Sequence, residues 1–505
     1  MLPYLNKETN RTEKYIVQFR GINYGEGARD GEMSACENLS TEKYPFLVPR
    51  RNRTKVAQYT APHTLHTKEG LLVIDDTTVY YNGNVVGTVE PGKKQVATVG
   101  RYIVIFPDKV YYDVTSNEFA SMEAHYSAAG LVFSGSAITT TGEDWPFRVG
   151  DAVEIAGCAK EGNNKTIIVR GVEGKVLTFY DYSFEEATES GTVTVSRNVP
   201  DLDFICESNY RLWGTKDNTI YASKYSDPFN FNNFDGLTSD SYFIDVGSDG
   251  KFTGCIPYSS HICFFKENVL HKLYGSKPSN YQVVTTQVQG VQEGSERSLC
   301  VINEQLFYKG VHGVYAYSGG IPSLVSECFD SMRYSEAAAA SDSERYYISM
   351  RNGDEWHLFS YDVRKDIWLR EDATHALDMT VYDGEVYFIG EDGGLYLIDR
   401  TASRDDVEWS ATFCTFNETM DERKGYNRFN MRIHMESGAW LAVDLMTDED
   451  GNWREVYTHR NERARTLTIP IIPTRCDSVT IRVRGSGDCT IKAFIREFTV
   501  GSDVV

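Results

Sequence analysis

The stretch Ser298–Leu324, SLCVINEQLFYKGVHGVYAYSGGIPSL, decides the fold class of this chain. Its apolar residues alternate over Leu299–Phe307, and a turn is expected at Lys309–Gly310. A second alternation covers Val314–Tyr317, after which Ser318–Gly320 turns the chain again. Alternation with a period of two is typical of β-strands, and short Gly-containing breaks are typical of the turns between antiparallel strands. The stretch therefore predicts a meander of short antiparallel strands.

Six further stretches repeat this order of strand, polar turn and aromatic strand: Leu71–Val89, Arg101–Phe119, Tyr210–Tyr225, Ser259–Gly275, Arg345–Leu369 and Asp378–Asp399. Their turns are expected at Asp75–Asp76, Asp108–Lys109, Lys216–Asn218, Lys266–Asn268, Asn352–Asp354 and Asp383–Gly384. In the first stretch, Asn82–Gly83 has the composition of a type I′ hairpin turn. One small sheet cannot bury both of its faces, whereas sheets stacked around an axis can. The repeats predict a β-propeller of about seven blades.

The length of 505 residues exceeds one ordinary core, so a large repeat architecture with additions is expected. Residues 130–200 lack the repeat pattern of the blades. They contain four or five expected short strands and are predicted to form a small β-barrel inserted in a blade loop. Beyond Asp399, strands without the blade pattern predict a C-terminal antiparallel sandwich. The predicted layout is an N-terminal arm (1–55), first blades (56–129), the barrel (130–200), the remaining blades (201–404) and the sandwich (405–505).

The arm, Tyr15–Arg53, has one strand and then a Gly-rich stretch, and is predicted to be ordered without forming a blade. It ends in the basic cluster Arg50, Arg51 and Arg53, for which a solvated loop leading into the first blade is favoured. In the sandwich, the sequence IRVRG predicts Ile481 and Val483 inside and Arg482 and Arg484 outside. That outer face would meet either solvent or a partner.

The formal net charge is −21 at pH 7, from 51 Lys and Arg against 72 Asp and Glu. The part from Glu408 onward has 13 Lys and Arg against 15 Asp and Glu, a net of −2, which leaves −19 for residues 1–407. Sequence-independent binding of nucleic acid needs a surplus of basic residues on one face, because phosphate contacts supply most of its affinity. The acidic body argues against such binding.

The ten cysteines are scattered singly, mostly within apolar strands, and are predicted to be reduced core residues. No apolar run approaches the roughly 20 residues that span a bilayer, and the N-terminus is too polar for a signal peptide. We therefore expect synthesis in the cytosol and no membrane insertion.

Motifs of the common enzyme classes are absent: the sequence has no G-x-S-x-G, H-E-x-x-H or Walker A motif. His63 and His66 could share a metal ion from one helical turn, but their surroundings indicate loop or strand, where residues three apart face opposite sides. His271 and His312 are expected to be core or turn histidines rather than catalytic residues. No catalytic residue, cofactor site or metal site is predicted.

Acidic runs also lack the pattern of a site. Asp448–Gly451 is without the alternating ligands and distal Glu of a calcium loop, so a hairpin turn is favoured. The pairs Asp75–Asp76, Glu185–Glu186 and Asp405–Asp406 are adjacent in sequence. Adjacent strand residues point apart, which is poor geometry for a pair of glycosidase carboxylates.

The aromatic-rich stretch Tyr221–Phe234, YASKYSDPFNFNNF, has two interpretations. Exposed, it would offer a platform for stacking a sugar or a protein. Buried, it would fill a loop between blades, and Pro228 would fix the turn. We favour burial of its aromatic residues Tyr225, Phe229, Phe231 and Phe234.

The arm sequence FRGINYGEGARDGEMSACENLSTEKYPFLVPRRNR resembles the start of phage tail nozzle proteins, the tail tubular protein B group of short-tailed phages and related stabilization proteins. In that family, three short motifs precede a propeller: Gly-Ile/Leu-Asn, a motif similar to Asn-Leu-Ser, and Pro…Arg. The stretch Arg211–Phe231, RLWGTKDNTIYASKYSDPFNF, is similar to a blade of the same family. The resemblance is in the general sequence pattern over much of the chain, and it includes no catalytic motif.

The resemblance implies a virion protein that forms a homo-oligomeric ring at the end of the portal and adaptor channel, contacts other tail and adaptor proteins, and lets DNA pass without specific binding. An acidic body suits such a passage, because it repels a polyanion. The residues Arg423, Lys424, Arg428 and Arg432 would then form a docking surface for neighbouring tail proteins.

We therefore predict a non-enzymatic structural component of a bacteriophage tail. One alternative is a glycan- or receptor-binding module at the tail tip or baseplate, motivated by the sandwich and the aromatic residues Phe229–Phe234. Another is a propeller hydrolase, which would need carboxylates that converge on the propeller axis.

Overall fold

The computed structural model describes residues 11–26, 29–418, 423–460 and 463–500, which form 48 β-strands and four short 3-10 helices. The chain divides into two compact units. Unit 1 comprises Met1–Tyr59, Cys300–Tyr308 and His312–Val505, and unit 2 comprises Thr60–Leu299 and Lys309–Val311. In the described ranges, no helix is both long enough and apolar enough to cross a membrane.

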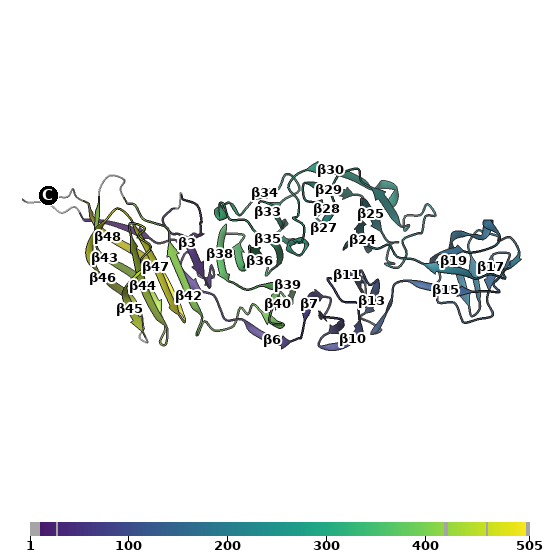
Figure 1. Cartoon of the computed structure of the whole chain (residues 1–505), viewed down its shortest axis with the longest axis horizontal. Coiled ribbons are helices and arrows are strands. Elements are labelled where there is room, and N and C mark those ends of the chain that lie inside the picture. Colours follow the sequence, from purple (N-terminus) through teal and green to yellow (C-terminus); the bar gives the residue numbers. More distant parts are fainter. Residues whose placement is uncertain (1–10, 27–28, 419–422, 461–462, 501–505) are drawn as a thin grey trace, which may run out of the picture. The chain divides into compact units, whose positions relative to one another are not determined.

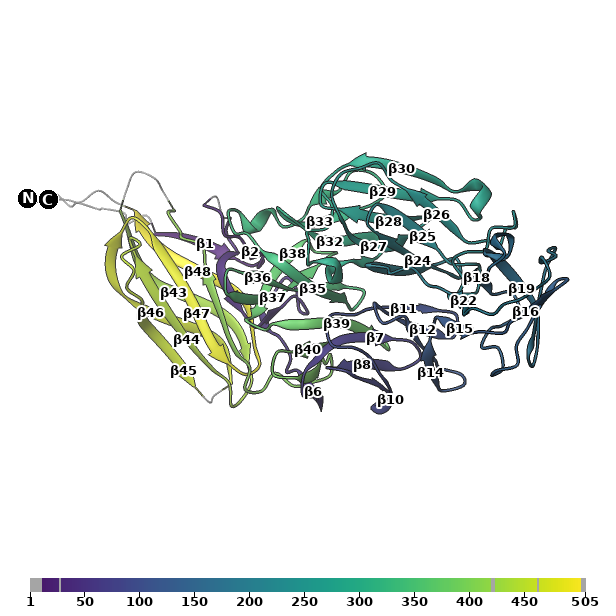
Figure 2. The same cartoon turned by 45° about the vertical axis from the view of Figure 1, so that its right-hand side comes forward.

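Unit 2 contains four antiparallel sheets of four strands each (Figure 2). The first consists of β7 (Pro62–Thr67), β8 (Leu71–Asp75), β9 (Thr78–Tyr81) and β10 (Asn84–Thr88). The second consists of β11 (Gln95–Val99), β12 (Tyr102–Phe106), β13 (Val110–Asp113) and β14 (Glu118–Ser121). The third consists of β23 (Phe204–Ser208), β24 (Arg211–Lys216), β25 (Thr219–Ala222) and β26 (Tyr242–Asp245). The fourth consists of β27 (Phe252–Tyr258), β28 (His261–Lys266), β29 (Val269–Tyr274) and β30 (Gln282–Gln287).

Three more four-stranded sheets belong wholly or mainly to unit 1. They are β31 (Cys300–Ile302), β32 (Gln305–Gly310), β33 (Gly313–Tyr317) and β34 (Ser323–Leu324); β35 (Ser335–Ser341), β36 (Arg345–Asn352), β37 (Glu355–Asp362) and β38 (Ile367–Asp372); and β39 (Ala376–Tyr382), β40 (Glu385–Gly390), β41 (Gly394–Leu397) and β6 (Thr54–Gln58). The seven sheets confirm the predicted all-β propeller of about seven blades. The sequence did not reveal that Thr54–Gln58 supplies the outer strand of the last blade.

Burial falls from the middle to the outer strand of a blade. Every residue of β28 is buried, whereas most residues of β30 are exposed. A strand that is covered on both faces needs apolar residues at successive positions rather than at alternate ones. This explains continuous apolar runs such as HICFF in β28 and YIVIF in β12.

In six blades the turn lies at or next to the position predicted from the sequence, and in one blade it does not. Asn82 and Gly83 have φ angles of 50° and 77°, as a type I′ turn requires. The predicted turn at Lys309–Gly310 is wrong, because both residues belong to β32 and the turn follows at Val311–His312. Lys309 is fully buried, and its Nζ donates to Gln292 Oε1 at 2.7 Å. A lysine that is paired inside a sheet has the same appearance in the sequence as a turn lysine.

The insert is one eight-stranded sheet that curves around a single apolar core, as the small barrel was predicted to do (Figure 1). Its strands run in the order β15-β22-β18-β19-β20-β17-β16-β21. They are β15 (Ala124–Ala128), β16 (Val132–Ser134), β17 (Ala137–Thr139), β18 (Ala152–Ala156), β19 (Lys165–Glu173), β20 (Val176–Phe179), β21 (Ala187–Thr188) and β22 (Val193–Arg197). The 3-10 helices of the chain are Glu161–Asn163, Pro278–Asn280, Glu296–Ser298 and Glu327–Phe329.

The C-terminal part is a sandwich, as predicted, and the N-terminal arm belongs to it. One sheet has the order β1-β48-β43-β46 and the other β2-β3-β42-β47-β44-β45. The strands are β1 (Arg11–Ile16), β2 (Gly21–Ile22), β3 (Glu32–Glu37), β42 (Glu408–Phe413), β43 (Lys424–Met435), β44 (Trp440–Thr447), β45 (Arg454–Arg460), β46 (Ala464–Cys476), β47 (Val479–Ser486) and β48 (Cys489–Val500). Ile481 and Val483 are buried, and Arg482 and Arg484 lie outside, where both pair with Asp444.

The arm is more regular than the sequence indicated, because its strands pair with distant ones. β1 pairs with β48, β3 pairs with β42, and the short strands β4 (Leu39–Ser40) and β5 (Val48–Pro49) pair with each other. Phe19, Ile22 and Leu47 belong to one apolar core that also contains residues of the blade β35–β38 and of the sandwich. At Gly21, a Cβ atom would lie 2.4 Å from the carbonyl oxygen of Trp368, so only glycine permits this approach.

The basic cluster at the end of the arm is not the solvated loop that was favoured. Arg53 is 11% exposed, and its guanidinium pairs with Glu371 at 2.8 Å and with Asp372 at 2.9 Å. Arg50 pairs with the same Asp372 at 3.3 Å, while Arg51 pairs with Glu42. Burial alone would raise the pKa of Asp372, but the charges of Arg53 and Arg50, together with hydrogen bonds from Thr374, hold the pKa below its usual value.

We expect Arg53→Met to destabilise unit 1 by about 3 kcal/mol, because it leaves the buried Glu371 and the partly buried Asp372 with fewer partners. The matched control is Arg351→Met, since Arg351 pairs with Glu336 at the surface and such pairs contribute less than about 1 kcal/mol. Thermal unfolding followed by circular dichroism measures both variants. Equal transition temperatures for the two would contradict the buried network.

The same network predicts a pH dependence. Because the folded-state pKa of Asp372 is lowered from 3.8, its contribution is complete above that pH and is lost as the pH falls through the folded value. The difference in transition temperature between the wild-type chain and Arg53→Met should therefore narrow below pH 3.8. A constant difference from pH 7 to pH 3 would show that the carboxylates do not carry the effect.

Candidate functional site

The loop that follows β25 carries the aromatic-rich stretch, and the structure divides its aromatic residues into two classes. Phe229 and Phe231 are each 4% exposed, as expected for loop filling. Tyr225 and Phe234 are 49% and 53% exposed, which contradicts the prediction of burial. The ring of Phe229 lies 4.8 Å from that of Tyr111 in the neighbouring blade sheet, and this packing explains its burial.

A buried arginine holds the far end of this loop. Arg211, which is 1% exposed, donates from Nη1 to the carbonyl of Asp240 at 2.5 Å and from Nη2 to that of Thr238 at 2.9 Å. The carboxylate of Asp240 in turn accepts the backbone N–H groups of Gly236 at 2.6 Å and Leu237 at 2.9 Å. The loop tip therefore has a fixed conformation.

The insert is attached to the same loop by buried polar contacts. The Asn230 amide donates to Asp151 Oδ1 at 3.0 Å and accepts the N–H of Ala152 at 2.9 Å. Arg197 pairs with Asp151 at 2.6 Å and donates to the carbonyl of Met122 at 2.9 Å. Because each of these groups is buried and paired, the insert and the loop keep a constant spacing.

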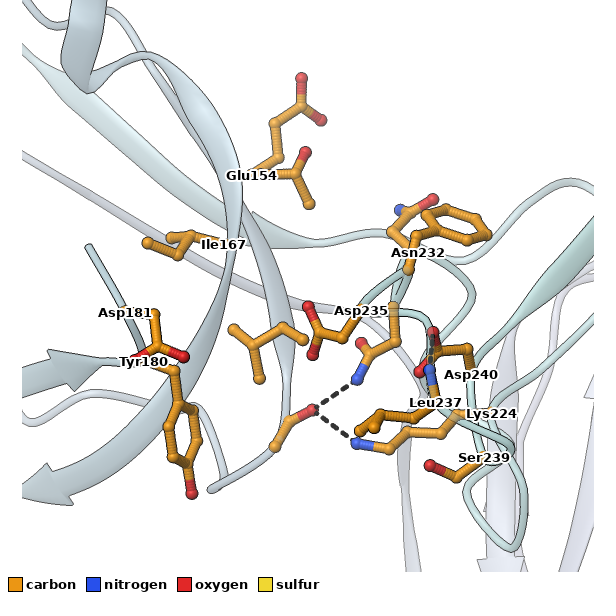
Figure 3. Close-up of a pocket in the computed structure, with 15 residues that line it drawn as sticks. Glu154, Ile167, Tyr180, Asp181, Lys224, Asn232, Asp235, Leu237, Ser239 and Asp240 are labelled. Atoms are coloured by element: carbon orange, nitrogen blue, oxygen red, sulfur yellow. Dashed lines mark hydrogen bonds between the residues drawn. The ribbon is translucent and has the colours of Figure 1, made fainter.

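Between the insert and the loop lies a cleft of about 940 Å³ (Figure 3). Ile167, Tyr180 and Asp181 line it from the insert, and Asn232, Asp235 and Leu237 line it from the loop. A second cavity of about 420 Å³ shares three lining residues with the cleft, namely Phe234, Leu237 and Asp240. The two hollows therefore adjoin along the loop.

The cleft is rich in hydrogen-bonding groups and poor in positive charge. Lys224 is the one cation among its lining residues, and it donates to the carbonyl of Gly150 at 3.3 Å. Glu154, Asp181 and Asp235 are exposed carboxylates on its surface. Such a site suits an uncharged ligand that offers hydroxyl groups, because carboxylates accept hydrogen bonds from hydroxyls and repel anions.

The histidines behave as the sequence suggested. His63 and His66 lie on β7 and have separate partners, Asp76 O for His63 and the Thr98 hydroxyl for His66. Burial lowers the pKa of His66 to about 4. His271 bonds the hydroxyls of Ser248 and Thr285, and its burial likewise lowers its pKa to about 4. His312 is an exposed turn residue.

The other candidate residues do not assemble into a site. Asp448 accepts the N–H groups of Asp477 and Ser478 in a hairpin turn, as favoured. Asp75 accepts the N–H of Ala61, and in the described ranges no group of three or more His, Cys, Asp or Glu residues could hold a metal ion. The ten cysteines are free, and six of them are buried.

The proposed docking set near the start of the sandwich is not one surface. Lys424 is 2% exposed and donates to the carbonyl of Asp477 at 2.7 Å, so it cannot contact a partner. Arg428 pairs with Glu497, and Arg423 with Asp448. Arg432 alone of the four is exposed without a salt bridge among the described residues.

Sequence reasoning missed the lining residues outside the aromatic stretch, above all Tyr180 and Asp181 of the cleft and Phe243 of the second cavity. Tyr180 follows β20 and Phe243 lies in β26, so they are distant from each other in sequence. One local signal was present in the sequence: Asp181 is a residue type that is common in turns. In the structure its φ is 47°, a conformation that Asp tolerates. Nothing in the sequence indicated that the insert would meet this loop.

No protein-family model matches the chain, and the search of curated proteins found no match. Among solved structures, BamB from Moraxella catarrhalis matches with a TM-score of 0.34 and 11% identity over 69% of this chain and 97% of that one. The phage phi92 endosialidase matches with a TM-score of 0.27 and 10% identity over 93% of this chain and 76% of that one. At these scores the matches carry no argument, and the fold rests on the strand pairing described above.

We expect Arg197→Met to loosen the insert, because Asp151 then stays buried with one partner fewer and the bond to Met122 is lost. Hydrogen exchange measured by mass spectrometry should show faster exchange in β22 and in the loop 223–241. The control is Lys216→Met, whose exposed pair with Asp203 should leave exchange there unchanged. Identical exchange in both variants would contradict the clamp.

Proposed function

We propose that this chain is a structural component of a bacteriophage tail, a subunit of a nozzle or hub ring that other tail proteins contact and through which DNA passes. The observation that carries the proposal is the course of the N-terminal arm in unit 1. The arm gives strands to both sheets of the sandwich through β1, β2 and β3 and then supplies β6 to the last blade. The same segment carries the resemblance to tail nozzle proteins.

This course suits a part that carries mechanical load. β1 and β3 lie along strands that are more than 370 positions away in sequence, so several hydrogen bonds must break together before the sandwich separates from the arm. The shared apolar core adds Phe19 and Ile22 to the same joint. A subunit that holds its place while DNA moves past it needs such a joint.

The charge distribution supports the passage of DNA. Residues 1–407 carry a net charge of −19 and the remainder −2. A surface with excess negative charge does not hold DNA by neutralising its phosphates, and the polymer can therefore slide.

A second candidate function, recognition of a receptor at the tail tip, is favoured by the exposed aromatic residues Tyr225 and Phe234.

In a phage that encodes this chain, we expect the protein in purified particles at a fixed multiple of the portal ring. A nonsense mutation in its gene should give heads that contain DNA and lack the distal tail, because the ring that closes the channel is missing. Quantitative mass spectrometry and electron microscopy of the particles measure this. Particles that lack the protein, or complete tails in its absence, would refute the tail role.

A further inference from the structure

Exposed aromatic residues are concentrated on one part of unit 2. Six aromatic side chains count as exposed among the described residues: Tyr15, Tyr180, Tyr210, Tyr225, Phe234 and Phe243. All of them except Tyr15 lie on the insert or on the blade β23–β26. Apolar surface is unfavourable in water, so burying large exposed aromatic groups in a complex is favourable. Their concentration in one region therefore marks a binding surface.

Three of these rings border the two adjoining hollows. Tyr180 lines the cleft, Phe243 lines the second cavity, and Phe234 lines both. The rings of Phe234 and Phe243 meet edge to face at 5.7 Å, which fixes their orientation. The adjoining hollows have volumes of about 940 and 420 Å³, which is more space than a single sugar ring needs.

The polar groups of the cleft match hydroxyls. Asp181 on the insert and Asp235 on the loop are exposed acceptors on opposite sides (Figure 3). Asn233, which is 2% exposed, lines the cleft and donates from Nδ2 to the carbonyl of Gly150. Its buried Oδ1 has no hydrogen-bond partner in the described structure, so this wall of the cleft holds one unsatisfied acceptor.

The charge of the cleft excludes polyanions. Its lining has one cation, Lys224, against four carboxylates, of which Asp240 is occupied by the backbone of its own loop. Flat apolar rings beside hydroxyl acceptors, without a cationic anchor, are complementary to the alternating C–H faces and hydroxyls of an uncharged sugar. A peptide would bring backbone N–H and C=O groups that also need hydrogen-bond partners.

We propose that the cleft between the insert and the loop 223–241 binds an uncharged glycan chain, with Tyr180 and Phe234 as stacking platforms and with the carboxylates of Asp181 and Asp235 accepting its hydroxyls. This assignment deepens the second candidate function, and it holds whether or not the chain forms a tail ring. Phe231 is 4% exposed and belongs to the core, so its substitution would not test this site.

Affinity electrophoresis of the purified full chain tests the assignment with three neutral polysaccharides, dextran, laminarin and galactomannan, and two anionic ones, polygalacturonate and hyaluronate. We expect at least one neutral polymer to retard the chain and the anionic polymers to leave it unaffected. Retardation by no neutral polymer, or by the anionic polymers alone, overturns the proposal. So does binding that a casein-derived peptide mixture abolishes, because a peptide would then be the occupant.

Variants locate the site. Tyr180→Ala and Phe234→Ala should each weaken binding by about twofold to tenfold, since a stacking ring contributes roughly 0.5–1.5 kcal/mol. The control Tyr15→Ala removes an equally exposed ring from unit 1 and should bind as the wild type does. Asp235→Asn keeps shape while removing charge, and should weaken binding about threefold to tenfold because a charge-assisted hydrogen bond is lost.

Thermal unfolding of each variant shows whether it is folded, which the exposure of all four side chains leads us to expect. Equal retardation of Tyr180→Ala, Phe234→Ala and Tyr15→Ala would place binding elsewhere and overturn the assignment. Failure of the particle experiment above would refute the tail role and leave this binding result unchanged, so the two proposals are tested separately.

Discussion

The pairing of β6 with β41 is the contact on which the last blade depends. Gly394 lies opposite Gln58, and Leu397 lies opposite Thr54. Without β6, the last blade would end in an exposed edge at β41, open to pairing with another chain. The Thr54 hydroxyl also donates to Asp399, 345 positions away, and this bond helps to fix the register. Because the entropy of closing a loop rises only with the logarithm of its length, so distant a pairing costs little more than a nearer one.

Buried arginines stabilise segments whose backbone groups are not paired in a sheet. Loops between blades present carbonyl groups that no strand satisfies, and a guanidinium has five donors with which to bind several at once. Arg211 binds carbonyls of the loop that forms one wall of the cleft. Arg496, which is fully buried, pairs with Glu418 and Asp30 and so ties the arm to the sandwich. Buried arginines therefore stabilise both the joint between the arm and the sandwich and the loop that forms one wall of the cleft.

The blades could be predicted from the sequence because their information is local. A hairpin such as Asn82–Gly83 is determined by residues next to each other. The arm could not be predicted in the same way, since its strands have partners hundreds of residues away and no periodicity of their own. The cleft was predictable in part, because composition singled out the stretch 221–234. Which of its rings are buried depends on tertiary contacts, such as those of Arg148 and Arg197 with the face of Phe229.

Negative charge connects the two proposed roles. The proposed tail channel needs a surface that repels DNA, and the cleft, like residues 1–407, carries more carboxylates than cations. A cell surface presents both charged and uncharged glycans, and a site of this charge discriminates against the former at distances up to about a Debye length, roughly 8 Å at physiological salt. Selection for a polyanion-repelling body would therefore by itself bias any glycan site on it toward uncharged chains. Under these two proposals, the preference for uncharged chains would follow from the net charge of −19 on residues 1–407, and the aromatic rings would direct the ligand to the cleft.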